Sequence, residues 1–173
     1  MLRSMPRYLW FTILAFVIAL GTAGYLGLHR LRSGPTPLDF PKGILKVYTA
    51  HHTYTLHIEV ASTEAQLTRG LMYRTSLPPD AGMLFIMPSL TDGAFWMYHT
   101  LIPLSIAFIS GNGVIEKILQ MQPCTSQDPS LCPQYFPNVA YRYALEVNLH
   151  WFRDHGVHPG DYISFTFSYT PSR

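Results

Sequence analysis

The chain has 173 residues, of which 48% are hydrophobic, 14% aromatic and only 13% charged. This composition excludes an intrinsically disordered chain and favours one β-rich globular domain with a substantial core. The net charge is +2, but from Ser33 onward ten acidic residues outnumber eight scattered lysines and arginines. Because nucleic-acid binding needs a basic stripe or patch, we expect no nucleic-acid partner.

The first predicted element is the apolar run Tyr8–Leu28, which contains no charged residue. A helix of that length spans the roughly 30 Å hydrocarbon core of a bilayer. It is either an uncleaved anchor or a secretory signal with its cleavage site at Gly21–Ala23. The anchor is favoured because the apolar character resumes at Tyr25.

The sequence therefore divides into three parts. We expect a membrane anchor or signal segment over residues 1–32, a proline-rich spacer over residues 33–42, and a β domain over residues 43–173. The β domain should lie outside the cytoplasm, attached to the membrane through Tyr8–Leu28, or be secreted if that segment is cleaved.

The β domain is predicted to be α+β but mainly β, a compact antiparallel or barrel-like sheet with two short helices. Residues alternate between apolar and polar from Thr53 to Ala61, and Asn112-Gly113 predicts a hairpin turn. A capping box at Thr63 predicts a helix to about Leu71 or Met72. Strands are expected at Gly43–Thr49, Thr53–Ala61, Met83–Met87, Leu104–Ile109, Val114–Met121, Tyr141–Val147 and Tyr162–Ser168.

Three local details complete this prediction. Pro88 is expected to end the strand Met83–Met87, which should be buried on both faces. A second short helix is expected over His150–His155, before Gly156. In the last strand, the side chains predicted to face inward are Ile163, Phe165 and Phe167.

Cys124 and Cys132 are the only two cysteines, and both lie in a long loop over residues 122–140. A domain outside the cytoplasm is in an oxidising environment, so a disulfide is the leading interpretation. Two thiols at this spacing lack the second ligand pair of a zinc site, and the C-x-x-C motif of thioredoxin-like proteins is absent. The sequence predicts no metal site and no cofactor.

The aromatic stretch from Phe95 to Thr100 is either core or the wall of a pocket. Glu146 lies in an apolar strand, where an unpaired carboxylate is costly, so we expect it to meet Arg69, Arg74 or Arg142. Such a pair would serve either the fold or a ligand. The candidate ligand-binding residues are Arg69, Met72, Arg74, Phe95, Trp96, Met97, His99, Thr100 and Glu146.

Several ordered motifs resemble the family known as domain of unknown function 192, over roughly Ile44 to Phe167. They are Arg69–Arg74, Gly82–Phe85, Phe95–Met97 with Thr100 and Ile102–Leu104, Tyr143–Glu146, and Gly160-Asp161. The resemblance implies a compact, mainly antiparallel β domain and no established activity. The family usually has a lysine at position 98, an asparagine at position 99 and an aspartate at position 105, whereas this chain has Tyr98, His99 and Ser105.

Three functions are compatible with these residues. The leading hypothesis is a membrane-tethered, non-enzymatic module that binds a small molecule or an envelope peptide or protein on the aromatic stretch. The second is an envelope-acting enzyme with His99 as its base. A base needs a partner or substrate proton within reach, and Ser105 lies six residues away across Pro103. The third is Cu(I) binding by thioethers and an imidazole, with core packing as the alternative. Its ligands would be Met72, Met83, Met87, Met97 and His99.

Overall fold

The computed structural model describes residues 38–168. The predicted membrane segment Tyr8–Leu28 and most of the predicted spacer lie outside those residues. Within the described part of the chain, no helix is long and apolar enough to cross a membrane.

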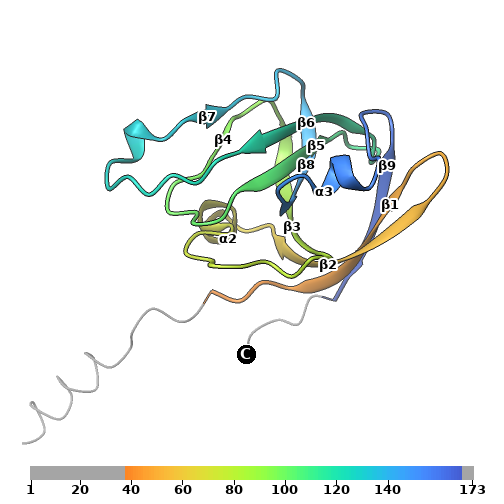
Figure 1. Cartoon of the computed structure of the whole chain (residues 1–173), viewed down its shortest axis with the longest axis horizontal. Helices are drawn as coiled ribbons and strands as arrows, with labels where there is room; N and C mark the ends of the chain where they lie inside the picture. The colour runs from red at the N-terminus through yellow and green to blue at the C-terminus, as the bar shows by residue number, and fades with distance from the viewer. Residues whose placement is uncertain (1–37, 169–173) are drawn as a thin grey trace, which may run out of the picture. The chain divides into compact units, whose positions relative to one another are not determined.

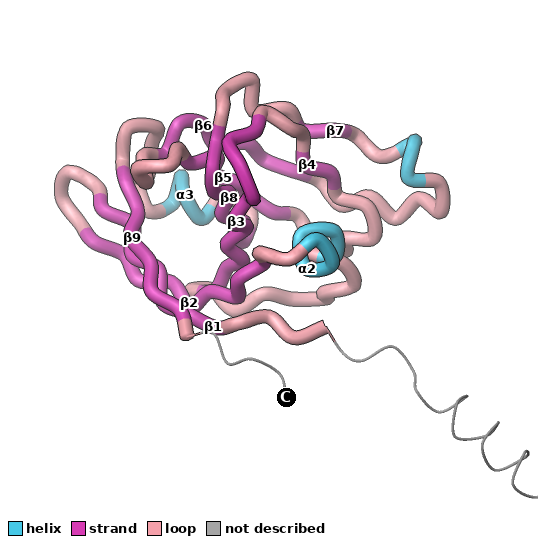
Figure 2. Tube along the Cα trace, turned by 180° about the vertical axis from the view of Figure 1, so that it is seen from behind, coloured by secondary structure: helices cyan, strands magenta, loops and turns pink. Residues whose placement is uncertain are grey.

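Seven strands form one curled sheet, a half-barrel in the order β6-β5-β8-β3-β2-β1-β9 (Figures 1 and 2). Neighbouring strands are antiparallel except for β2 and β3, which are parallel. The predicted mainly β class with two short helices is confirmed. The strands are β1 (Lys42–Tyr48), β2 (Thr53–Ala61), β3 (Ala81–Thr91), β5 (Leu104–Ile109), β6 (Ile115–Met121), β8 (Tyr141–Asn148) and β9 (Tyr162–Phe167).

The two edges of the sheet meet beside the β5–β6 turn. The Ile163 amide donates to the Gly113 carbonyl at 2.8 Å, and the Ile115 amide donates to the Asp161 carbonyl at 2.8 Å. Gly113 has a φ of 87°, as the predicted Asn112-Gly113 turn requires. The contact satisfies backbone groups that an open edge would leave unpaired.

Gly113→Ala is expected to destabilise the fold by roughly 2–3 kcal/mol, because its φ is strained for alanine and the new Cβ would meet a backbone atom. That Cβ would lie 2.8 Å from the Ile163 carbonyl oxygen. Gly111→Ala is the matched control, since its Cβ would meet only the Arg142 Cβ at 4.0 Å. Urea unfolding measures both variants, and equal stabilities would show that the edge contact is dispensable.

The crossover between the parallel strands β2 and β3 contains α2 (Glu64–Arg69). The predicted capping box is present, since the Thr63 hydroxyl accepts from the Gln66 amide and the Gln66 side chain returns to the Thr63 amide. The expected end at Leu71 or Met72 is wrong. Gly70 has a φ of 44° and ends the helix two residues earlier.

Three other local predictions need correction. Pro88 does not end the strand, because β3 runs on to Thr91 through a register shift that spares the proline a ladder hydrogen bond. Phe167 is 38% exposed near the end of β9, whereas Ile163 is buried as expected. The second helix, α3 (Trp151–Asp154), is shorter than predicted.

The two faces of the sheet carry separate cores. The inner core lies within the curl, and the outer core lies under α2 and the small sheet of β4 (Phe95–Trp96) and β7 (Gln134–Tyr135). The short η1 (Pro129–Leu131) has no buried residue and lies in the loop before β7. Representative inner residues are Leu45, Leu56, Leu84, Leu145 and Phe152. Representative outer residues are Met83, Phe85, Met97, Ile106 and Phe108.

Candidate functional site

Glu146 lies in the centre of the sheet, on the outer face of β8. Its register partners are Met83 of β3 and Ile106 of β5, both fully buried. Only 4% of Glu146 is exposed, and its carboxyl group makes no ion pair or hydrogen bond with residues 38–168. Burial raises the pKa of Glu146 to about 8, so the carboxyl group is mostly neutral at pH 7.

The prediction that Glu146 pairs with an arginine is wrong. Arg74 forms an ion pair with Glu59 instead. The Arg69 guanidinium carbon lies 4.7 Å from the centre of the Tyr73 ring, a cation–π contact. The third expected partner, Arg142, has a buried Nη1 atom without a hydrogen-bond partner. None of these arginines therefore forms an ion pair with Glu146 in the described part of the chain.

A narrow cleft between α2 and β4 opens onto this carboxyl group, and we call it the Glu146 cleft. Its volume is about 30 Å³, enough for about two water-sized groups. Phe85 and Phe95 form part of its wall, with ring centres 5.1 Å apart in an edge-to-face contact. Six of the nine predicted residues line the cleft: Arg69, Met72, Phe95, Trp96, Thr100 and Glu146.

The exit of α2 shapes one wall of the cleft. Gly70 lines it, and a Cβ at Gly70 would lie 3.2 Å from the Phe85 ring, so the close approach of helix and sheet favours glycine. The Tyr73 amide donates to the His99 carbonyl at 2.8 Å, which joins this exit to the segment after β4. This hydrogen bond links the α2 side of the cleft to the β4 side. Sequence reasoning missed Phe85 and Gly70 as lining residues, although both lie within the family motifs.

The other three predicted residues do not line the cleft. Met97 is fully buried in the outer core. The His99 ring stacks on Tyr73, with ring centres 4.9 Å apart, and contacts the tilted ring of Tyr98, whose centre is 3.9 Å away. Arg74 is held by Glu59. The structure thus places His99 beside the cleft wall, where its ring packs against aromatic neighbours.

Ser105 faces away from the cleft. Its register partner Val147 belongs to the inner core, whereas the preceding and following residues of β5 belong to the outer core. The Ser105 hydroxyl accepts a hydrogen bond from the His150 amide at 2.9 Å, just before α3. His99 and Ser105 therefore lie on opposite sides of the sheet, and the structure does not bring them together.

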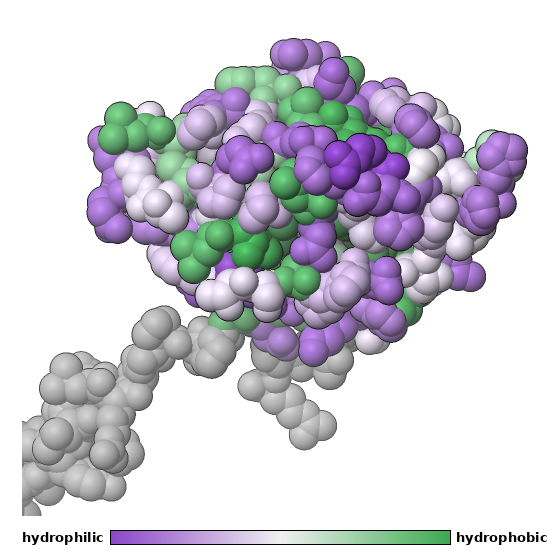
Figure 3. Space-filling view, in the orientation of Figure 1, coloured by the Kyte–Doolittle hydropathy of each residue, from purple (hydrophilic) through white to green (hydrophobic). Residues whose placement is uncertain are grey.

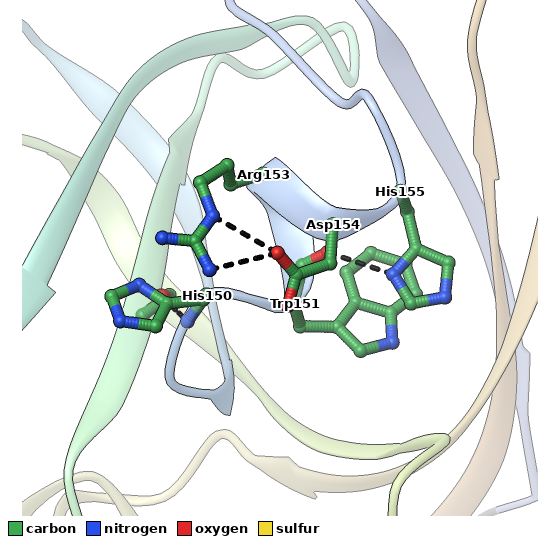
Figure 4. A network of polar contacts seen from close by, with 6 residues as sticks. His150, Trp151, Arg153, Asp154 and His155 are labelled. Atoms are coloured by element: carbon green, nitrogen blue, oxygen red, sulfur yellow. Dashed lines mark hydrogen bonds and ion pairs between the residues drawn. The ribbon is translucent and has the colours of Figure 1, made fainter.

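The residues around α3 make local contacts, shown in Figure 4. Arg153 pairs with the neighbouring Asp154, and the His155 Nδ1 atom lies 2.8 Å from the Trp151 carbonyl oxygen. The His155 ring also stacks on Trp151, with centres 4.2 Å apart. The Arg153–Asp154 pair is exposed, whereas the contacts of His155 with Trp151 connect the short helix to the inner core.

The methionines of the copper hypothesis lie mainly in the outer core. Met83 and Met97 are fully buried, and Met87 packs against the same cluster. Met72 alone among the four lines the Glu146 cleft. Within residues 38–168, no three histidines, cysteines or acidic residues gather as a metal site would require. The packing of Met83 and Met97 is that of ordinary core methionines.

The predicted disulfide between Cys124 and Cys132 is confirmed. Both cysteines are buried in the outer core, and the Cys124 amide donates to the Met97 carbonyl at 3.2 Å. The same loop supplies β7, which pairs with β4. The disulfide loop therefore covers the strand that carries Phe95 and Trp96.

On the face in Figure 3, apolar side chains form separate patches, one of them at the tip near η1, where Leu131 is 71% exposed.

The fold and the site define a class of protein: a small curled-sheet domain whose narrow cleft opens onto the buried acid Glu146. The chain belongs to the DUF192 family, described as uncharacterized ACR, whose profile matches residues 46–165. The predicted resemblance, placed over Ile44 to Phe167, is confirmed.

Two crystal structures are similar to this chain. One is described as a candidate transcription regulator from Sinorhizobium meliloti 1021, with 30% identity over 74% of this chain and 96% of that chain, and a TM-score of 0.68. The other is a protein of unknown function from Novosphingobium aromaticivorans DSM 12444, with 25% identity over 76% and 89% of the two chains and a TM-score of 0.64. No match was found among curated proteins.

Proposed function

We propose that this protein is a non-enzymatic binding module, tethered outside the cytoplasm, whose Glu146 cleft receives a small ligand or the end of a peptide side chain. The observation that carries the proposal is the buried, unpartnered carboxyl group of Glu146 at a cleft. A buried acid without a partner is costly, and apolar residues of similar size are usually at least as stabilising. A ligand that supplies the missing partner accounts for that cost.

The composition of the cleft favours binding over acid–base catalysis. Arg69 is the only other ionisable residue that lines it in the described chain, and arginine does not titrate near neutral pH. A glycosidase-type mechanism needs two carboxyl groups on opposite sides of the substrate. The predicted base, His99, packs on Tyr73 outside the lining. Convergent polar groups on an aromatic wall are typical of a recognition site.

Two observations support the location. The run Tyr8–Leu28 has the length and composition of a membrane anchor. The Cys124–Cys132 disulfide is a bond that persists mainly outside the reducing cytoplasm. An anchor followed by a proline-rich spacer would hold the domain close to a membrane surface, where it would meet envelope components.

Trp96→Ala is expected to weaken ligand binding at least tenfold while changing the stability by no more than about 1.5 kcal/mol, because the side chain is 40% exposed at the cleft. Leu131→Ala removes an equally apolar but distant exposed side chain and serves as the control.

The ligand is sought with a fragment library of amines, carboxylates, amides and alcohols, followed by ¹H–¹⁵N NMR of the full chain in maltoside micelles. A binding fragment should shift the Trp96 indole signal and the Gly70 and Thr100 amide signals together, since all three residues line the cleft. If no fragment class moves these signals, the Glu146 cleft is not a small-ligand site and the proposal fails.

A further inference from the structure

We propose that the Glu146 cleft selects a primary alkylammonium group, whose nitrogen binds the Glu146 carboxylate. This inference rests on the proposed function and specifies the class of its ligand. The group could be carried by a small amine or by a lysine side chain of a peptide, and the chemistry recognised is the same.

The size of the cleft limits what can reach the acid. A cavity of about 30 Å³ admits a slim terminal group and excludes a sugar, an aromatic ring or a nucleobase. An ammonium group with its adjoining methylene is a group of about two heavy atoms. The rest of the alkyl chain would pass Trp96, which lines the cleft and remains 40% exposed.

The wall suits a cation. Phe85, Phe95 and Trp96 all line the cleft, and aromatic faces attract ammonium groups within about 6 Å. A primary ammonium has three donors and no acceptor. It therefore complements the oxygen-bearing side chains of the lining, which are the carboxylate of Glu146 and the hydroxyls of Thr68 and Thr100.

The charges around Glu146 leave the carboxylate free for such a group. From β3 and β5 it faces Met83 and Ile106, and from β4 the cleft receives only aromatic side chains. Arg69 of α2 also lines the cleft, but its guanidinium group lies over the Tyr73 ring and forms no ion pair with Glu146. Arg69 and Tyr73 also line a neighbouring surface hollow with Glu64. Glu59, two strands away in the same cross-strand row, is occupied by Arg74.

Binding would move one proton. In the free protein Glu146 is protonated at pH 7, because burial raises its pKa to about 8. An alkylammonium group, with a pKa near 10.4, stays charged. When it binds, the carboxyl O–H bond breaks, the proton goes to solvent, and the carboxylate pairs with the ammonium nitrogen. The affinity should therefore rise with pH until Glu146 is ionised in the free protein.

The test is calorimetric titration of the full chain with n-butylammonium at pH 6, 7 and 8, in buffers of different ionisation enthalpy. We expect close to one proton released per ligand at pH 6, and an affinity that rises nearly tenfold from pH 6 to pH 7. Glu146→Gln should lose at least tenfold in affinity and release no proton. Glu116→Gln, which changes an exposed acid on β6, should match the wild type.

The neutral isostere n-pentanol separates this inference from the proposed function. If n-pentanol binds as tightly as n-butylammonium, with no proton released, the cleft takes neutral groups: the inference fails and the proposed function stands. If neither probe binds but another fragment class shifts the cleft signals, the inference also fails alone. Absence of binding by every class ends both.

A capped Gly-Lys-Gly peptide identifies the source of the ammonium group. Binding at least tenfold tighter than n-butylammonium, lost when norleucine replaces the lysine, would support the proposal with a peptide as the ligand. Equal or weaker peptide binding would support it with a small amine as the ligand. A norleucine peptide that binds as well as the lysine peptide would overturn it.

Discussion

Glu146→Gln is expected to stabilise the protein by an amount that grows as the pH rises from 5 to 8. In the wild type the pKa of Glu146 is about 8 in the folded state and near 4.5 in the unfolded state. Between these values the folded state binds more protons, so the free energy of unfolding falls as the pH rises. Glutamine keeps the shape of the side chain and does not ionise, so the variant lacks this loss.

Urea unfolding of both proteins at pH 5, 6, 7 and 8 measures the effect. The difference in the free energy of unfolding should increase by about 1.4 kcal/mol per pH unit within this window. Glu116→Gln supplies the control, since its acid is exposed on β6. Parallel curves for wild type and Glu146→Gln would show that the folded protein provides Glu146 with a partner or with water.

Loss of the disulfide is expected to have the second largest effect. The double variant Cys124→Ala, Cys132→Ala should be less stable by roughly 2–3 kcal/mol, because the unfolded chain regains the entropy of a short closed loop. It also loses two buried sulfur atoms from the outer core. Since this loop supplies the partner strand of β4, the NMR signals of Trp96 should broaden or shift as well.

Wild-type protein treated with a thiol reductant is the comparison for this variant, because it keeps both side chains and loses only the bond. Similar destabilisation of the two would assign the effect to the bond. If reduction changes neither the stability nor the Trp96 signals, packing alone holds the loop over β4.

The sheet was largely predictable because its signals are local. The alternation from Thr53 to Ala61 placed β2 correctly, and the Asn112-Gly113 turn placed the β5–β6 hairpin. The parallel pairing of β2 and β3 was not foreseen, because it depends on where the crossover through α2 returns the chain. The prediction that Pro88 ends the strand was wrong because a register shift, which the sequence does not reveal, accommodates the proline within β3.

Most residues of the site were predictable from the sequence, but the ion pair expected for Glu146 was not. The apolar strand around Glu146 indicated a buried carboxyl group, and burial is observed. Its expected arginine partner was wrong because the β2–β3 register places Glu59 in the same cross-strand row, where it takes Arg74. Competition between two acids for one arginine depends on tertiary register, which no local pattern reports.

Two of the departures from the family pattern, at positions 99 and 105, have backbone explanations in this chain. Position 99 has a φ of 53°, a conformation that asparagine tolerates well and that His99 adopts here while its ring stacks on Tyr73. Position 105 supplies an acceptor for the His150 amide, which a serine hydroxyl or an aspartate can provide. Neither His99 nor Ser105 lines the Glu146 cleft.

The most direct test of the account is the titration of Glu146 itself. Carbon-13 NMR of the full chain, with glutamate labelled at the side-chain carboxyl and the signal assigned through Glu146→Gln, follows its ionisation. The unpartnered, buried carboxyl group predicts a midpoint near pH 8 in the free protein. A midpoint near 4.5 would contradict it, because the acid would then be solvated or already paired and no ligand would be needed as its partner.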